Sequence, residues 1–171
     1  MPRLHGYYAD HLDRLLANDC ELKRNFHNSV WASTTFNFGP RTFCYKHKDF
    51  SNLSFGICSI YAAGSYDPKL GGHLILWECG LVIEFPPGST VLIPSAAITH
   101  SNVPVPQNST RYSITQYTAG GIFRWVDHGF QKEDPYWATL SDEEHEEELQ
   151  QMEGRARMGM GLFSTKDELL A

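Results

Sequence analysis

Short hydrophobic runs separated by turn residues dominate the middle of the chain. Most of them alternate between apolar and polar positions and are rich in β-branched and aromatic side chains, which is the pattern of half-buried β-strands. The runs cover residues 30–38, 42–47, 55–63, 73–77, 81–85, 90–93, 97–100 and 110–117, with 122–126 as a possible last strand. The run at 55–63 is mostly apolar, so we expect that strand to be buried on both faces. About nine short strands with Gly/Pro turns between them predict an all-β sandwich or barrel.

At both ends of the chain, the apolar residues recur at helical spacing instead of alternating. Residues from about 3 to 27 carry apolar side chains at helical spacing, and Asp19 is a candidate N-cap for a second helix within that segment. From about 132 to 170 the pattern is again helical, and Ser141 followed by Glu144 has the spacing of a capping box. We therefore expect a single domain over residues 1–171, with a β core at about 30–126 between two helical segments.

Composition and charge narrow the class of protein. Hydrophobic residues make up 42% of the chain and charged residues 20%, as in an ordinary folded protein. No apolar run approaches the roughly 20 residues that span a bilayer, and no signal peptide is visible, so we expect a soluble intracellular protein of the nucleus or cytoplasm without a membrane partner. The net charge of -6 does not favour a nucleic-acid surface. The four cysteines form no CxxC pair and no zinc pattern.

Three residues have the chemistry of a metal site. His47-Lys48-Asp49 places an imidazole and a carboxylate two residues apart at the end of a predicted strand. About fifty residues later, His100 ends another predicted strand. Two imidazoles and one carboxylate are the ligands of the facial triad that holds ferrous iron and leaves open positions for co-substrate and oxygen. His47, Asp49 and His100 are therefore the candidate metal ligands.

A cation follows the second histidine at the start of an alternating strand. Arg111 lies eleven residues after His100, and its guanidinium can pair with a carboxylate through two hydrogen bonds. Ser113 is two residues further on, so it shares a face with Arg111 and can bond the same carboxylate. The pair is a candidate anion site next to the metal ligands.

Together these motifs resemble the Fe(II)/2-oxoglutarate-dependent dioxygenases, which fold as a double-stranded β-helix, or jelly roll. The resemblance lies in the order H-x-D, Gly71-Gly72-x-Leu74, His100 and Arg111-x-Ser113. The string from Phe36 through Gly64-x-Tyr66-x-Pro68 to Gly71 looks closest to the TET/JBP-like branch. More narrowly, the chain is similar to a group of basidiomycete fungal proteins that share Phe85-Pro86-Pro87-Gly88-Ser89 and Arg124-Trp125-Val126.

The resemblance implies a mainly β jelly roll with flanking N- and C-terminal helices, and an activity. Fe(II) would bind His47, Asp49 and His100, and 2-oxoglutarate would bind Arg111 and Ser113. With O2 the enzyme would oxidise a methyl group on a base of methylated DNA or RNA (5-methylcytosine, thymine or N6-methyladenine), releasing succinate and CO2. The cysteine-rich zinc region of animal TET enzymes is absent, and the chain is acidic. The same chemistry on a protein side chain or small molecule is an alternative, and a non-catalytic jelly-roll binding module is a second.

Further residues are candidates for contacts around the metal. Asn37 and Arg41 precede the H-x-D motif and are candidates for contacts with substrate or co-substrate. Tyr45 is one of several aromatic residues suited to stack a flipped base. Asn52 and Asn102 are candidates for orienting the metal ligands through hydrogen bonds.

Overall fold

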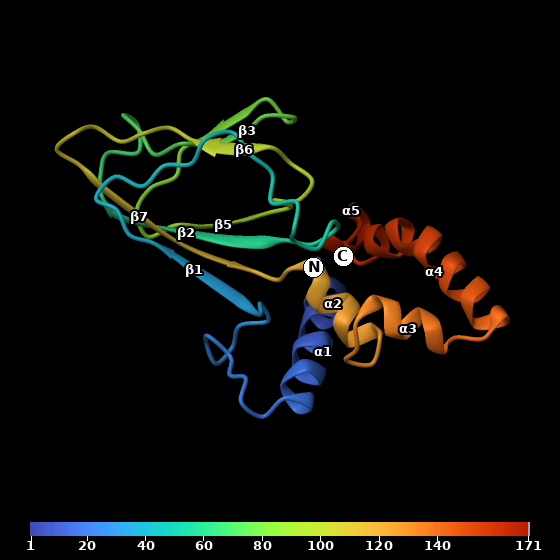
Figure 1. The fold of residues 1–171 in the computed structure, drawn as a ribbon. Coiled ribbons are helices and arrows are strands. Elements are labelled where there is room, and N and C mark those ends of the chain that lie inside the picture. Colours follow the sequence, from blue (N-terminus) through green and yellow to red (C-terminus); the bar gives the residue numbers. More distant parts are fainter. Residues whose placement is uncertain (171) are drawn as a thin grey trace. The chain divides into compact units, whose positions relative to one another are not determined.

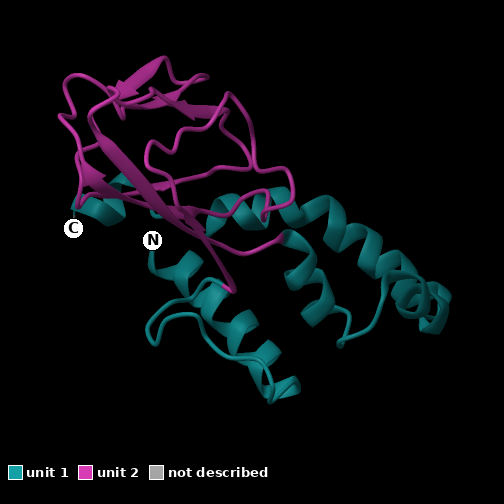
Figure 2. Ribbon diagram, turned by 60° about the vertical axis from the view of Figure 1, so that its left-hand side comes forward, with its two compact units in different colours: residues 1–31, 120–171 teal, residues 32–119 magenta. Residues whose placement is uncertain are grey.

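The computed structural model describes residues 1–170 and divides the chain into two compact units (Figure 2). One unit comprises residues 32–119 and is built of β-strands. The other joins residues 1–31 to the segment from 120 onward and is helical. The expectation of one domain over the whole chain stays a prediction, and each unit is described by itself.

The β unit consists of two antiparallel sheets (Figure 1). The strands are β1 (Ser33–Asn37), β2 (Cys58–Ser65), β3 (Leu74–Leu76), β4 (Leu81–Ile83), β5 (Thr90–Ile93), β6 (His100–Asn102) and β7 (Thr110–Tyr117). The four-stranded sheet has the order β1-β7-β2-β5, and the three-stranded sheet has the order β4-β3-β6. Beside β6, the segment before Asp49 adds an isolated antiparallel bridge between His47 and His100.

The path of the chain through these sheets is that of a jelly roll. After β2 in the larger sheet the chain crosses to β3 and β4 in the smaller one, returns to β5, crosses to β6 and returns to β7. This repeated crossing between two facing sheets is a double-stranded β-helix. The predicted fold class, mainly β with flanking helices, is confirmed.

The core of this unit fills the space between the sheets. It contains Cys58, Ala62, Leu74, Leu76, Phe85 and Ile93, which are all buried. Along β2, Cys58 and Ala62 are buried whereas Tyr61 is 37% exposed, so the expectation that this strand is buried on both faces is wrong. The sheet has a solvated outer face, because no helix of the β unit covers it.

Several predicted strands differ from the observed ones. Residues 42–47 form no strand, because Cys44 N–H bonds the side-chain oxygen of Asn102 instead of a backbone carbonyl. The predicted strand at 97–100 begins only at His100, since the N–H groups of Ala97 and Ile98 both close a turn on Pro94. The described residues therefore contain seven strands, whereas about nine were expected.

The helical unit contains five helices, and no helix of residues 1–170 is both long enough and apolar enough to cross a membrane. They are α1 (Pro2–Asn18), α2 (Gly120–Asp127), α3 (Glu133–Thr139), α4 (Asp142–Gly161) and α5 (Lys166–Leu170). Ser141 and Glu144 form the expected capping box at the start of α4. Helix α1 packs on α2 through Tyr8, whose ring lies 5.1 Å from that of Phe123.

Two predictions fail in this unit. Residues 122–126 are helical, not a strand, because Phe123 and Val126 are three apart and both buried on one helix face. The second helix expected before residue 27 is absent. Asp19 has extended backbone angles, and its carboxylate accepts a hydrogen bond from Glu21 N–H at 3.0 Å, which closes a local turn without continuing into a helix.

Candidate metal centre

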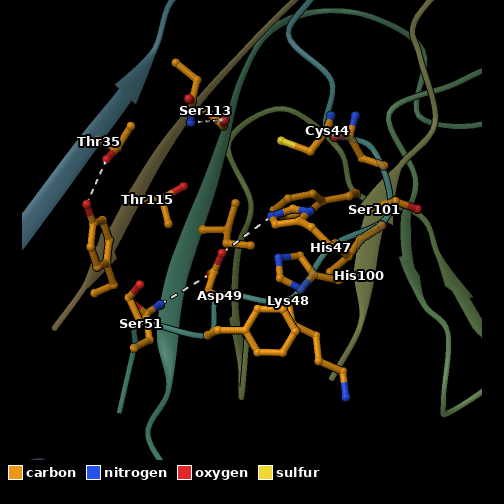
Figure 3. Close-up of a pocket in the computed structure, with 18 of the residues that line it drawn as sticks. Thr35, Cys44, His47, Lys48, Asp49, Ser51, His100, Ser101, Ser113 and Thr115 are labelled. Carbon is orange, nitrogen blue, oxygen red and sulfur yellow. Dashed lines mark hydrogen bonds and ion pairs between the residues drawn. The ribbon is translucent and has the colours of Figure 1, made fainter. Parts of the chain in front are cut away.

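His47, Asp49 and His100 meet at one point of the β unit. One ligand atom from each lies within 4.8 Å of the others, and no other group of three or more such residues is found among residues 1–170. The two imidazole centroids are 4.3 Å apart, and His47 Nε2 lies 3.5 Å from Asp49 Oδ1. Figure 3 shows both rings and the carboxylate turned toward one another. The backbone bridge between His47 and His100 produces this proximity, because it sets the two residues side by side.

Both imidazoles are oriented by their own backbone. His47 Nδ1 lies 2.7 Å from the carbonyl oxygen of Tyr45, and His100 Nδ1 lies 3.0 Å from that of Ile98. A carbonyl only accepts, so each Nδ1 donates its proton there and Nε2 is the ring atom that can face a metal. Burial lowers the pKa of His100, which favours the neutral imidazole that a metal needs.

The Asp49 carboxylate is oriented by a neighbouring side chain. Asn52 Nδ2 donates to Asp49 Oδ2 at 3.3 Å and to Ser95 Oγ at 3.2 Å. The N–H of Asp49 bonds the carbonyl of Ser95 at 3.0 Å. Asn102 acts further away, where its side-chain oxygen accepts the N–H of Cys44 at 2.7 Å. Asn52 therefore contacts a candidate ligand, whereas Asn102 fixes the segment that leads to His47.

Arg111 lies in the same pocket with its charge unneutralised. Its side chain is only 3% exposed, and no carboxylate of residues 1–170 forms a salt bridge with it. One terminal nitrogen donates to the carbonyl of Thr42 at 2.9 Å, while Nε is buried without a partner. Ser113 is buried on the same face of β7, and its hydroxyl accepts a hydrogen bond from Asn37 Nδ2 at 3.1 Å.

One cavity of about 540 Å³ connects these groups. Its lining includes eight of the residues singled out in the sequence: Asn37, His47, Asp49, Asn52, His100, Asn102, Arg111 and Ser113. Arg41 and Tyr45 do not line it. Arg41 is exposed and donates to the carbonyl of Gln107 at 3.0 Å. Tyr45 is 80% exposed and lies edge-on against Phe43.

The cavity also has lining residues that sequence reasoning missed. Thr115 and Tyr117 continue the face of β7 that carries Arg111 and Ser113. Thr35 on β1 pairs with Thr115 in the sheet, and its hydroxyl lies 3.4 Å from that of Tyr117. The strict alternation from Arg111 onward was the signal that would have found Thr115 and Tyr117. Phe50 also lines the cavity and is 84% exposed, so its ring lies at the mouth.

Comparison with known proteins matches the chain to several solved structures, two of which are described below. NgTET1 in complex with 5mC DNA aligns at 16% identity and a TM-score of 0.49, over 66% of this chain and 47% of that one. The viral collagen prolyl hydroxylase of Paramecium Bursaria Chlorella virus-1, in its 2OG complex, aligns at 11% identity and a TM-score of 0.34, over 63% of this chain and 68% of that one. This chain thus matches about half the length of NgTET1. No family model and no curated protein matches the sequence.

At these identities the likeness assigns no activity, so the chemistry rests on the residues themselves. Two imidazoles and one carboxylate on one side of a cavity suit a divalent transition metal such as Fe(II). A buried guanidinium without a carboxylate in the described chain suits a carboxylate ligand. The pocket therefore fits both a metal ion and an organic anion.

Proposed function

We propose that the protein is an Fe(II)- and 2-oxoglutarate-dependent dioxygenase. The observation that carries this proposal is that Arg111, buried and in no ion pair with a carboxylate of residues 1–170, lines the same cavity as the His47-Asp49-His100 cluster. A metal site alone fits many classes of protein. The addition of Arg111 favours a co-substrate that both chelates the metal and ends in a carboxylate.

Six residues of the pocket have a role in this proposal. His47, Asp49 and His100 hold the iron through three ligand atoms and leave its remaining positions open. Arg111 pairs with the distal carboxylate of 2-oxoglutarate, and the Ser113 hydroxyl bonds the same group. When bound, iron and 2-oxoglutarate use O2 to oxidise a substrate C–H bond, with release of succinate and CO2. Asn52 keeps the Asp49 carboxylate oriented.

We propose a methyl group on a nucleic-acid base as the site of oxidation. The TET/JBP-like string described above supports this choice, as does the exposed ring of Phe50 at the mouth of the cavity. Aromatic rings on a surface stack bases with little dependence on sequence. The methylated partner would be DNA or RNA that carries 5-methylcytosine, thymine or N6-methyladenine.

The charges next to His47 favour a second candidate, a small molecule or protein side chain. Lys48 forms an ion pair with Glu78 at 3.1 Å, and Lys46 lies 4.2 Å above the ring of Trp77. Both lysines that flank His47 are therefore engaged within the protein and are less available for phosphates. Most of the remaining cavity lining consists of neutral hydroxyl, amide and apolar groups.

The test is substrate-dependent succinate formation. Protein loaded with Fe(II) is incubated in air with 2-oxoglutarate and with methylated oligonucleotides, unmethylated oligonucleotides of the same sequence, peptides or metabolites. The proposal predicts succinate and a nucleoside gain of one oxygen with methylated oligonucleotides only, and neither product with His100→Ala. Stimulation by peptides or metabolites alone would support the second candidate. Binding of 2-oxoglutarate without succinate under any condition would contradict an oxygenase and indicate a binding module.

A further inference from the structure

The two candidate histidine ligands lie on separate segments that are joined by one isolated bridge. The N–H of His47 donates to the carbonyl of His100 at 3.0 Å, and the N–H of His100 donates back at 2.9 Å. No strand continues this pairing on the side of His47. A pairing of this length is weak by itself, so the residues around it determine how firmly the two imidazoles are placed.

Trp77 contacts one neighbour of each histidine. It follows β3, and its indole Nε1 donates to Ser101 Oγ at 3.1 Å. The Nζ of Lys46 lies 4.2 Å from the centroid of the same ring. Lys46 precedes the first histidine and Ser101 follows the second. In an antiparallel bridge these two positions lie across from each other, so one side chain holds both.

Glu78, the next residue in the chain, contacts the other neighbour of each histidine. Its Oε1 lies 3.1 Å from Lys48 Nζ and accepts the Thr99 hydroxyl at 2.5 Å, and its Oε2 accepts the Thr99 N–H at 2.8 Å. The hydrogen bond from Thr99, with a smaller contribution from Lys48, lowers the pKa of Glu78 to about 2, so the carboxylate is charged at neutral pH. Lys48 follows the first histidine and Thr99 precedes the second.

Two adjacent residues of the turn between β3 and β4 therefore contact all four residues that flank the histidines. The side chains of Glu78 and Lys48 are 46% and 29% exposed, and an ion pair so near the solvent adds little to global stability. Its place in the fold is nevertheless specific, because it connects the two segments that carry the imidazoles. The contacts are therefore better explained by the geometry of the metal centre than by the stability of the fold.

We propose that Trp77 and Glu78 form a clamp that sets the positions of His47 and His100 before a metal ion binds. The inference rests on the metal site of the proposed function and adds two positioning residues to it. Neither side chain lines the cavity, so both act through the residues next to the ligands. Ligands that are fixed in advance lose less entropy when an ion binds. Loss of the clamp should therefore weaken metal binding although all three ligands remain.

Metal affinity of the folded protein tests the clamp directly. Each variant is titrated with Mn(II), which replaces Fe(II) without turnover, and free Mn(II) is measured by its EPR signal. Glu78→Ala should weaken Mn(II) binding about tenfold, the lower end of the effect of removing groups that support metal ligands. The zero-field splitting of the bound ion should also change, because the imidazoles are held less regularly.

Two conservative variants separate the contacts. Glu78→Gln keeps an acceptor for Thr99 but has no charge for Lys48, so it should restore part of the affinity and remain about threefold weaker than the unaltered protein. Trp77→Phe keeps an aromatic ring and loses the donor to Ser101, so a loss of about threefold is expected there as well. A loss in Glu78→Gln as large as that in Glu78→Ala would contradict the role of Thr99.

Glu84→Ala is the matched control, because this exposed carboxylate follows β4 in the same sheet and does not line the cavity. It should leave Mn(II) binding unchanged, and equal losses in both alanine variants would indicate a general effect of charge and overturn the clamp. A lower Tm of Glu78→Ala with unchanged Mn(II) affinity would show structural support alone, which also overturns it. If the unaltered protein bound no Mn(II), the metal centre and the proposed function would fail together with the clamp.

Discussion

Arg111 holds a positive charge inside the β unit at a cost to stability. Burial removes the hydration of the guanidinium, and in exchange the described chain offers it the uncharged carbonyl of Thr42 and no partner for Nε. An uncompensated buried charge destabilises a folded protein. Arg111 is therefore better explained by a ligand than by the fold.

Replacement of Arg111 by methionine tests this explanation. Arg111→Met should leave the free energy of unfolding of the ligand-free protein unchanged or raise it by about 1 kcal/mol, because an apolar side chain of similar length replaces a buried charge. The affinity for 2-oxoglutarate should fall by a factor of about 100 or more, because two charge-assisted hydrogen bonds are lost. Urea denaturation and calorimetric titration measure the two effects. Arg41→Met is the matched control, and similar affinity losses in both variants would contradict the assignment.

Asn52 allows a second test at the same scale. Asn52→Ala removes the donor that holds Asp49 Oδ2, so the affinity for Fe(II) or Mn(II) should fall about 10- to 100-fold. Competition with a metal indicator measures it. Asn108→Ala changes an exposed amide away from the cavity and should have no effect. Unaltered metal affinity in Asn52→Ala would mean that the carboxylate is held by the backbone alone.

At the residue scale, the structure brings together those predicted residues whose side-chain chemistry restricts their use. His47, Asp49 and His100 were recognisable because their ligand types and order are specific, and the structure brings them together. Arg41 was selected because it precedes the H-x-D motif, and Tyr45 because it is an aromatic residue near that motif that could stack a base. Proximity along the chain does not give the direction of a side chain, and both point to other partners.

At the scale of elements, predictions from local patterns succeeded when the pattern was long. The alternation over Thr110–Tyr117 and the capping box at Ser141 were both found as expected. The five residues 122–126 fit a strand and a helix equally well. Only packing decides between them. Phe123 contacts Tyr7 and Tyr8 of α1, a partner more than a hundred residues away in sequence.

The same pair of helices is joined by an ion pair that responds to pH. His11 Nε2 on α1 lies 2.9 Å from Asp127 Oδ1 at the end of α2, and Arg155 of α4 donates to the other oxygen at 3.2 Å. Burial lowers the pKa of His11, but the hydrogen bonds to Asp127 and to the Tyr7 carbonyl, together with the nearby negative charges, raise it by more, so the net shift is upward. Burial raises the pKa of Asp127, and the bonds from His11 and the nearby arginines lower it overall.

These shifts fix the sign of the pH dependence. The stabilisation from His11 is fully present below the unfolded-state pKa of about 6.5 and is lost as the pH rises through the raised folded-state value. The stabilisation from Asp127 is present above about pH 3.9 and is lost as the pH falls. Stabilisation by His11 should therefore be larger at pH 5.5 than at pH 8.5, so His11→Gln should lower the free energy of unfolding in urea by more at pH 5.5 than at pH 8.5. The exposed His5→Gln should show no such difference between the two pH values, and equal losses at both in His11→Gln would contradict this account.

At the scale of the β unit, the cavity depends on both sheets. Arg111 and Ser113 come from the four-stranded sheet, whereas His100 begins a strand of the three-stranded one. The number and spacing of strands predicted an all-β sandwich or barrel, and the resemblance to the dioxygenases narrowed this to a jelly roll. The division into two units could not be predicted, because it depends on contacts between residues 1–31 and the segment after 119, which no local pattern reveals.

A ligand that spans the two sheets should stabilise the fold. With Mn(II) bound and 2-oxoglutarate at 100 times its dissociation constant, mass action adds about 2.7 kcal/mol. For a chain of this size the increase in Tm is roughly 5 to 10 °C. Thermal unfolding with and without 2-oxoglutarate measures it. Arg111→Met should keep the increase caused by Mn(II) and lose the one caused by 2-oxoglutarate, and equal increases in both proteins would place the binding site elsewhere.

The central claim is that one cavity holds Fe(II) and 2-oxoglutarate together. Its most direct test is the visible absorption of the protein mixed with both under anaerobic conditions. We predict a metal-to-ligand charge-transfer band that requires Fe(II) and 2-oxoglutarate together and disappears in His47→Ala and Asp49→Ala. A folded, unaltered protein that shows no band with both components in excess would contradict the account.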